Sequence, residues 1–174
     1  MKKNIVLTGF MGAGKSTVGK KLARTLNMSI VDTDDLIESR AEMSITDIFA
    51  RHGEEHFREL EEKVVEEVSR LENHVIVTGG GVVLRESNMK NLKKNGVVIY
   101  LHATPEVIYE RIKDQTHRPL LQVDDPMAKI KELLEYRAPF YANNDFTVDT
   151  SNLSVEEVVE EILRVLRKKG LISS

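Results

Sequence analysis

Residues 4–17, Asn-Ile-Val-Leu-Thr-Gly-Phe-Met-Gly-Ala-Gly-Lys-Ser-Thr, decide the fold of this chain. The apolar run Ile5–Leu7 predicts a short buried strand, and the glycine-rich segment after it predicts a turn. Val18, Leu22 and Leu26 then recur at helical spacing. Together these parts predict a strand that passes through a glycine-rich turn into a helix.

The turn matches the Gly-x4-Gly-Lys-Ser pattern of a phosphate-binding P-loop, from Gly9 to Ser16. Backbone N–H groups in such a loop, together with the positive end of the next helix, face an anion. Lys15 can reach the terminal phosphates of a nucleoside triphosphate, and the Ser16 hydroxyl can bind Mg²⁺. A glycine-rich turn with an incidental lysine is the alternative. The order strand, turn, helix favours the nucleotide site.

Composition predicts one globular domain over residues 1–174, because 41% of the 174 residues are apolar and 30% are charged. The net charge of −3 provides no basic footprint for nucleic acid. The absence of cysteine excludes disulfides and thiolate metal sites. No apolar run is long enough for a membrane span, and Met1–Lys3 leads into the first strand without a signal peptide. We therefore expect a cytoplasmic monomer that binds neither nucleic acid nor a membrane.

Five short apolar runs rich in β-branched residues alternate with helical patterns. This alternation predicts an α/β fold of the P-loop NTPase type, a parallel five-stranded sheet with helices on both faces. Residues 34–72 are predicted to be a helical insertion that binds the second substrate. The five runs are Ile5–Leu7, Ser29–Val31, Val75–Val77, Val97–Leu101 and Phe146–Val148.

Residues 113–125 show no periodicity of either kind. A stretch of this length without a pattern is either functional or disordered. The segment contains Arg118 and lies between two helical patterns, which favours the interpretation that it is a mobile lid that closes on an active site.

Two aspartates follow the second predicted strand. Asp32 comes directly after Ile30-Val31, where it could join Ser16 in holding Mg²⁺. In extended geometry Asp34, two residues on, would point the same way and could accept hydrogen bonds from a second substrate. A pair of helix-capping aspartates is the alternative.

Three glycines, Gly79, Gly80 and Gly81, follow the third predicted strand. Ligands of open α/β sheets bind at the carboxyl ends of strands, and glycines allow a ligand close to the backbone. A tight turn without a ligand is the alternative. Arg58, with Glu61 three residues later, and Arg137 are candidates to grip an anionic acceptor, since a guanidinium can bind a carboxylate with two hydrogen bonds.

The chain resembles the shikimate kinases over nearly its whole length. The resemblance rests on linked segments, of which the P-loop alone would be unspecific. These are Gly9-Phe-Met-Gly-Ala-Gly-Lys-Ser-Thr17, Asp32-Thr-Asp34, Ser44-Ile-x-x-Ile48-Phe49, Gly53-Glu54-x-x-Phe57-Arg58-x-x-Glu61, Gly79-Gly-Gly81, Arg118-Pro-Leu-Leu121 and Arg137-x-Pro139-x-Tyr141.

This resemblance implies that ATP phosphorylates the 3-hydroxyl of shikimate, a step towards chorismate and the aromatic amino acids. It implies that Asp34 meets the ring hydroxyls and orients or deprotonates the nucleophile. Arg58 and Arg137 would hold the shikimate carboxylate, helped by the glycines at 79–81. Glu61 would orient Arg58.

The resemblance also implies the ATP side of the site. Lys15 and Arg118 would stabilise phosphate charge, and Ser16 and Asp32 would hold Mg²⁺. Some relatives carry an arginine or proline in the loop that flanks adenine, whereas this chain has residues 151–154, Ser-Asn-Leu-Ser. Backbone contacts are expected to replace that side chain. The implied ATP-binding set is Gly12, Ala13, Gly14, Lys15, Ser16, Thr17, Arg111 and Arg118.

Three other activities fit parts of the pattern. A kinase of another hydroxy acid, such as gluconate, would use the same P-loop and arginines. A nucleotide-dependent switch would need Asn-Lys-x-Asp and Asp-x-x-Gly patterns, which are absent. An adenylate kinase fits the architecture, but Asp32, Arg58 and the glycines suit a carboxylated polyol better than a nucleotide.

Overall fold

The computed structural model describes residues 3–115 and 122–173. Its strands are β1 (Asn4–Thr8), β2 (Ser29–Asp32), β3 (His74–Val77), β4 (Gly96–His102) and β5 (Phe146–Asp149). Its α-helices are α1 (Lys15–Leu26), α2 (Thr33–Ala41), α3 (Ile45–Val68), α4 (Glu86–Lys94), α5 (Pro105–Ile112), α6 (Pro126–Tyr141) and α7 (Val155–Lys168). A short 3₁₀ helix, η1, spans Val82–Leu84.

The five strands form one parallel sheet in the order β2-β3-β1-β4-β5, which confirms the predicted α/β class. The central strand β1 pairs with β3 on one side and β4 on the other, and its residues Ile5–Leu7 have no exposed surface. The strand order reverses at β1. Ligands of open sheets bind outside the carboxyl ends at such a reversal, which is where the P-loop begins.

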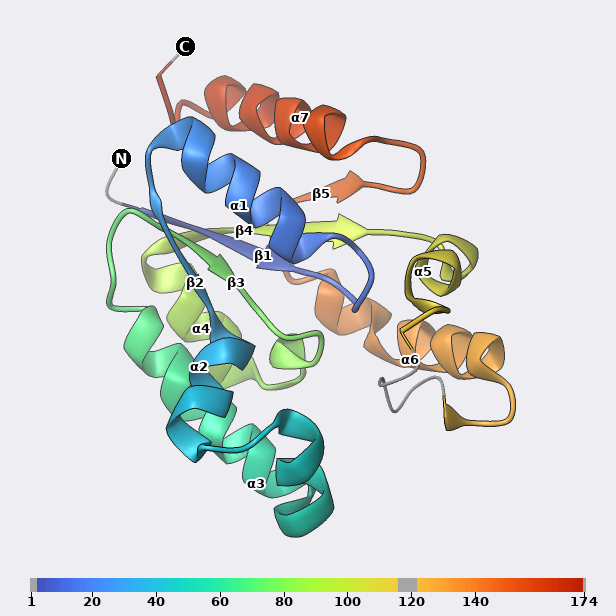
Figure 1. The fold of residues 1–174 in the computed structure, drawn as a ribbon. Helices are drawn as coiled ribbons and strands as arrows, with labels where there is room; N and C mark the ends of the chain where they lie inside the picture. Colours follow the sequence, from blue (N-terminus) through green and yellow to red (C-terminus); the bar gives the residue numbers. More distant parts are fainter. Residues whose placement is uncertain (1–2, 116–121, 174) are drawn as a thin grey trace.

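Helices cover both faces of the sheet (Figure 1). On one face α1 and α7 pack against the strands, and Leu22 and Ile162 lie in that core. On the other face α3, α4 and α6 bury a second core that includes Val65, Met89 and Tyr141. A smaller cluster around Phe10 packs the P-loop against α5 and α6 at the carboxyl edge of the sheet.

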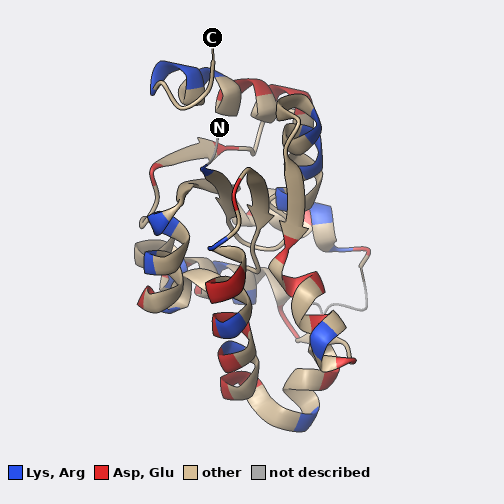
Figure 2. Ribbon diagram, turned by 90° about the vertical axis from the view of Figure 1, so that its left-hand side faces the viewer, with Lys and Arg blue, Asp and Glu red and all other residues tan. Residues whose placement is uncertain are grey.

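The helix ends follow local sequence signals. Gly14 is the residue before α1 and has a left-handed φ of 93°, a conformation that glycine adopts without steric cost. Ser154 and Glu157 form a reciprocal capping box at the start of α7. The first turn of α7 is acidic and its last turn is basic, which complements the helix dipole, and Figure 2 shows this change of sign along the helix.

The predicted helical insertion lies between β2 and β3 as α2 and α3. Ser44 caps α3 by accepting from the Asp47 N–H. The helix is kinked at Gly53, where φ is 85° and ψ is 171°, a conformation open almost only to glycine. In the described residues no helix combines the length and apolarity that a bilayer crossing needs.

Candidate active site

The P-loop wraps around the ammonium group of Lys15. Its Nζ donates to the carbonyl oxygens of Gly9 and Phe10, the second over 3.1 Å. The same Phe10 carbonyl accepts from the Ala13 N–H, which closes the turn. A Cβ on Gly12 would lie 2.9 Å from Ile112 Cγ2, so the loop packs too closely against α5 for a larger residue.

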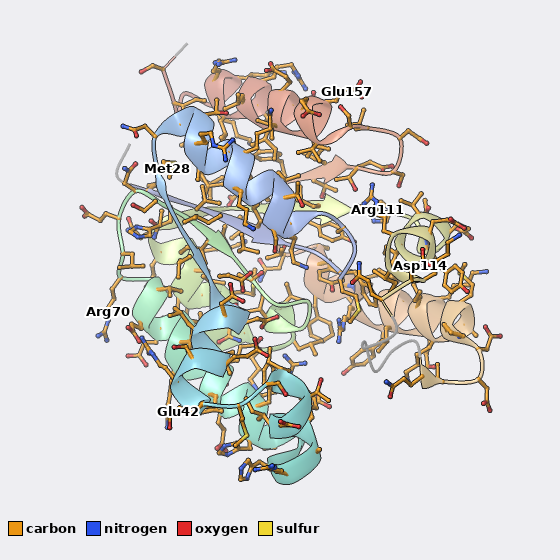
Figure 3. The ribbon with its side chains drawn as sticks, viewed as in Figure 1. Met28, Glu42, Arg70, Arg111, Asp114 and Glu157 are labelled. Atoms are coloured by element: carbon orange, nitrogen blue, oxygen red, sulfur yellow. The ribbon has the colours of Figure 1, made fainter. Side chains whose placement is uncertain are left out.

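Arg111 joins the P-loop to the segment after β5 (Figure 3). Its Nη1 donates to the Gly12 carbonyl over 2.9 Å, and its Nη2 donates to the Thr150 carbonyl over 3.0 Å. Beside it lies a cavity of about 220 Å³, between the start of α1 and the start of α7. Its lining combines four residues implied by the resemblance with five others: Ala13, Gly14, Thr17, Val18, Arg111, Thr150, Leu153, Val155 and Val158.

Ser16 and Thr17 are exposed in the first turn of α1. Their hydroxyls therefore sit at the positive end of that helix, where an anion or its counter-ion would bind. Asp32 caps the next helix, because its Oδ1 accepts from the N–H groups of Asp34 at 2.9 Å and Asp35 at 3.2 Å. Burial raises the pKa of Asp32, an effect that the neighbouring Lys15 partly offsets.

The extended geometry predicted for Asp34 is wrong. Asp34 lies in the first turn of α2, since Asp32 ends its strand by capping that helix. The capping alternative is therefore correct for Asp32, while the Asp34 carboxylate still lies in the site. Its Oδ1 is buried and has no hydrogen-bond partner among the residues that the structure describes.

The pKa of Asp34 is raised to about 7. Burial is the largest cause, and the negative charges of Asp32 and Glu61 add to it. The Lys15 ammonium acts in the opposite direction. Asp34 therefore lies within electrostatic range of both the P-loop lysine and the buried carboxylate of α3, between the two halves of the site.

Each of the three glycines after β3 lies against one predicted acceptor-binding side chain. A Cβ on Gly79 would lie 2.5 Å from Asp34 Oδ1. A Cβ on Gly80 would lie 3.3 Å from the Nη1 of Arg137, and a Cβ on Gly81 would overlap the Arg58 guanidinium. The segment also turns tightly, because the Gly79 carbonyl accepts from the Val82 N–H over 3.2 Å.

Arg58 and Glu61 form a buried ion pair on α3. Arg58 Nη1 donates to Glu61 Oε1 over 2.8 Å, and the two side chains are 10% and 1% exposed. Burial raises the pKa of Glu61, although Arg58 and Arg137 both act to lower it. A second carboxylate, that of exposed Glu54, lies 3.5 Å from Arg58 Nε.

Arg137 lies inside α6, and its guanidinium carbon is 5.5 Å from the centre of the Phe10 ring in the P-loop. Its Nε is buried and has no hydrogen-bond partner in the described part of the chain. The guanidinium groups of Arg58 and Arg137 therefore face the strand ends rather than bulk solvent.

Sequence reasoning missed two residues that shape the glycine segment. Thr33 is fully buried, and its Oγ1 accepts from the Gly79 N–H over 3.3 Å. The Tyr141 hydroxyl donates to the Gly80 carbonyl over 2.7 Å. Thr33 lies between Asp32 and Asp34, and Tyr141 lies one helical turn after Arg137. Their positions next to predicted site residues are the sequence signal that could have identified them.

Two predictions, the Arg118 contact and the magnesium site, are not both covered by the described residues. Arg118 and residues 116–121 of the predicted lid lie outside the described residues. Within the described ranges 3–115 and 122–173, no group of three or more His, Cys, Asp or Glu side chains could by itself hold a metal ion.

Comparison with known proteins gives one consistent result. The family model for shikimate kinase matches residues 11–167. A shikimate kinase of Caldanaerobacter subterraneus subsp. tengcongensis is 57% identical over 97% of this chain and 99% of its own. A shikimate kinase of Bacillus mycoides is 45% identical over 92% and 96%.

The solved structures agree with this. A shikimate kinase from Acinetobacter baumannii in complex with shikimate superposes with a TM-score of 0.93 at 35% identity, covering 99% of this chain and 97% of its own. A shikimate kinase from Aquifex aeolicus superposes with a TM-score of 0.81 at 39% identity, covering 97% and 98%.

Proposed function

The chain belongs to the shikimate kinase family, and we propose that the site at the carboxyl edge of its sheet transfers the γ-phosphoryl group of ATP to the 3-hydroxyl of shikimate. One observation carries the assignment of residues. Asp34, Arg58 and Arg137, from three different helices, meet at three consecutive glycines beside the P-loop. A carboxylated polyol fits such a surface, with cationic groups for its carboxylate and an anionic group for its hydroxyls.

Arg58 and Arg137 bind the shikimate carboxylate in this proposal. Both guanidinium groups are held against bare backbone, and a charge-assisted hydrogen bond to each contributes about 1.5–3 kcal/mol. Glu61 fixes the Arg58 fork through the 2.8 Å bond, so the fork does not have to be ordered when the acceptor arrives. A Cβ at Gly79 or Gly81 would overlap Asp34 or Arg58, and a Cβ at Gly80 would make a tight 3.3 Å contact with Arg137.

Asp34 orients the reacting hydroxyl or accepts its proton. A base works best when its pKa lies near the working pH, and the pKa of Asp34 is raised to about 7 by burial and by the charges of Asp32 and Glu61. Its unpartnered buried Oδ1 is an acceptor ready for a hydroxyl donor. The pH dependence of kcat/KM for shikimate distinguishes a base from an orienting acceptor.

Lys15 stabilises the charge of the transferring phosphoryl group. Phosphoryl transfer depends mainly on positioning and electrostatic stabilisation, which the P-loop amides and this ammonium supply. Arg118 keeps the same role as a prediction from the sequence. Arg111, Thr150 and the cavity beside them form the adenine side of the nucleotide site.

Magnesium is held by Ser16 and Asp32 in this proposal. Mg²⁺ prefers oxygen ligands and is usually bound by one or two carboxylates together with substrate phosphates and water. The residues fit, since Ser16 is exposed beside the P-loop and both capping bonds of Asp32 go to Oδ1, so Oδ2 takes part in neither. The ion, when bound, neutralises phosphate charge.

A coupled ADP assay with ATP, Mg²⁺ and a panel of acceptors tests the proposal. We expect rapid turnover with shikimate and slow turnover with quinate, gluconate and AMP. A faster acceptor than shikimate would redirect the assignment to another hydroxy-acid kinase, and ADP production that no acceptor stimulates would favour a nucleotide-dependent switch.

Arg58→Lys tests the acceptor assignment separately. An ammonium cannot reproduce the guanidinium fork, so the KM for shikimate should rise about tenfold or more while the KM for ATP stays near that of the parent. The matched control is Arg70→Lys, because Arg70 lies just after α3, is exposed and pairs only locally with Glu66 (Figure 3). An unchanged shikimate KM in Arg58→Lys would refute the role of Arg58.

The proposal extends to the organisation of the chain. Residues 34–72 are the acceptor-binding region of a single kinase domain over 1–174, with 113–125 as its lid segment, and the protein acts as a cytoplasmic monomer. Light scattering on the eluted peak of a sizing column would test the monomer, since a dimer would double the mass of 19.7 kDa.

A further inference from the structure

Tyr141 is a buried tyrosine that touches the backbone of the candidate acceptor site. It is the last residue of α6, is 1% exposed, and donates its hydroxyl hydrogen to the Gly80 carbonyl over 2.7 Å. Its ring stacks on Tyr100 of β4 with the centroids 4.8 Å apart and the planes 9° from parallel. The stack against the sheet fixes the direction in which this hydroxyl points.

The glycine segment needs such an anchor. Three glycines in a row have more backbone freedom than any other tripeptide, so their peptide planes rotate easily unless they are bonded. The carbonyls of Gly79 and Gly81 accept from N–H groups of the adjoining η1 turn, at 3.2 and 3.1 Å. Within the described residues, the Gly80 carbonyl is the one of the three that is held by a residue distant in sequence, Tyr141.

The bond to Gly80 also sets the Gly81 N–H. The Gly80 carbonyl and the Gly81 N–H belong to one planar trans peptide, in which the two groups point in opposite directions. Gly81 lies against the Arg58 guanidinium. The hydroxyl of Tyr141 therefore fixes a backbone donor next to one of the two arginines assigned to the acceptor carboxylate.

Tyr141 is linked to the second arginine as well. Arg137 precedes Tyr141 by one helical turn, so the two side chains share a face of α6. The Arg137 guanidinium, like the Tyr141 hydroxyl, lies against Gly80. Burial raises the pKa of Tyr141, although Arg137 and Arg58 act to lower it. The hydroxyl thus stays neutral and able to donate over the range in which kinases work.

We propose that Tyr141 is a positioning residue for the acceptor: its hydroxyl holds the Gly80–Gly81 peptide in the orientation that, with Arg58 and Arg137, receives the shikimate carboxylate. The inference rests on the proposed function, because it acts through the arginines that function assigns. Tyr141 does not touch the reacting atoms. Removing the Tyr141 hydroxyl is therefore expected to weaken shikimate binding and to leave ATP binding unchanged.

The test is Tyr141→Phe, which removes one oxygen and keeps the stacked ring. We expect the KM for shikimate to rise about tenfold, the size typical of one lost hydrogen bond that leaves a buried group unpaired, with the KM for ATP within about twofold of the parent. Thermal unfolding in the presence and absence of shikimate reads the same loss as a smaller shikimate-induced rise in Tm.

Tyr100→Phe is the matched control. It removes a hydroxyl from the partner ring of the same stack. That hydroxyl pairs with His102 Nδ1 over 3.1 Å, whereas the Tyr141 hydroxyl bonds to the glycine segment. Its shikimate KM should stay near that of the parent. Equal rises in both variants, or parallel rises in the KM for both substrates, would show a general packing effect and overturn the inference.

The combination with Arg137→Lys separates the inference from the proposed function. If Tyr141 acts through the carboxylate-binding arginines, its effect should be less than additive in the Arg137→Lys background. Additive effects would overturn the inference. A raised KM in Arg137→Lys with an unchanged KM in Tyr141→Phe would overturn the inference alone. An unchanged KM in Arg137→Lys would instead refute the proposed carboxylate site.

Discussion

Arg58 and Glu61 form an ion pair that is almost completely removed from solvent, with 2.8 Å between Arg58 Nη1 and Glu61 Oε1. The pKa of Glu61 is raised by burial despite its partner, so the attraction does not fully compensate desolvation. A buried pair of this kind is weak support for stability. Its position at Gly81 supports the proposal that the pair holds a cationic fork for the acceptor carboxylate.

Glu61→Gln should destabilise the protein and weaken shikimate binding. Removing Glu61 leaves the buried Arg58 charge with the exposed Glu54 as its partner, at a cost on the order of 3 kcal/mol in the free energy of unfolding. The matched control is Glu54→Gln, because Glu54 faces the same arginine but is 62% exposed, and exposed pairs contribute at most about 1 kcal/mol. Chemical denaturation measures both. Equal losses would contradict the distinction.

Asp34→Asn should change the pH dependence of stability. The folded-state pKa of about 7 lies above the ordinary value of 3.8, so the stability from protonated Asp34 is present below pH 3.8 and is lost as the pH rises through 7. Relative to the Asn variant, the parent should lose up to about 4 kcal/mol of unfolding free energy between pH 4 and 8. Asp35→Asn, at the exposed neighbour, should keep the parental slope.

If Asp34 is a base, the activity of the parent should depend on pH with the pKa of Asp34. The value of kcat/KM for shikimate should then rise with pH and level off with an apparent pKa near 7, because only the ionised carboxylate can accept a proton. A profile that is flat from pH 5.5 to 8.5 would limit Asp34 to positioning the hydroxyl. Initial rates at saturating ATP measure the profile.

Gly79→Ala should lower kcat by about a hundredfold, the loss that follows when a catalytic group is displaced by about 1 Å. Its new Cβ would lie 2.5 Å from Asp34 Oδ1, and Gly79 is outside the left-handed region, so the effect is steric and not a backbone strain. The control is Gly170→Ala, where φ is 72° and nothing lies within 4 Å of the new Cβ. That variant should lose stability and keep its kcat.

Arg111→Gln should raise the KM for ATP about tenfold, since it removes the charged donor that holds the Gly12 and Thr150 carbonyls together. The shikimate KM should change less than twofold, because the hydrogen bonds of Arg111 go to Gly12 and Thr150 on the nucleotide side. Arg164→Gln, at an exposed arginine paired with Glu161 on α7, is the control. A larger effect on shikimate than on ATP would refute this placement.

Local patterns accounted for most of the secondary structure. All five predicted strands occur, and Ser44 and Ser154 cap helices through hydrogen bonds to backbone groups three residues on. Such signals act over a few residues, so they are legible without a fold. The predicted extended geometry of Asp34 is wrong, because the sequence at Asp32 is compatible both with the end of a strand and with a helix cap. In the structure Asp32 caps α2, which places Asp34 in the first turn of that helix.

The sequence by itself determined the phosphate-binding loop, the parallel α/β class and, through linked motifs, the family. These depend on glycine positions, apolar periodicity and residue order, all of which are local. Tertiary structure alone decided that Asp34, Arg58, Arg137 and Tyr141 meet at three glycines, and that the pKa of Asp34 moves to about 7. Contacts between residues as many as 61 positions apart, and the burial that raises a pKa, arise only when helices from separate segments pack at one edge of the sheet.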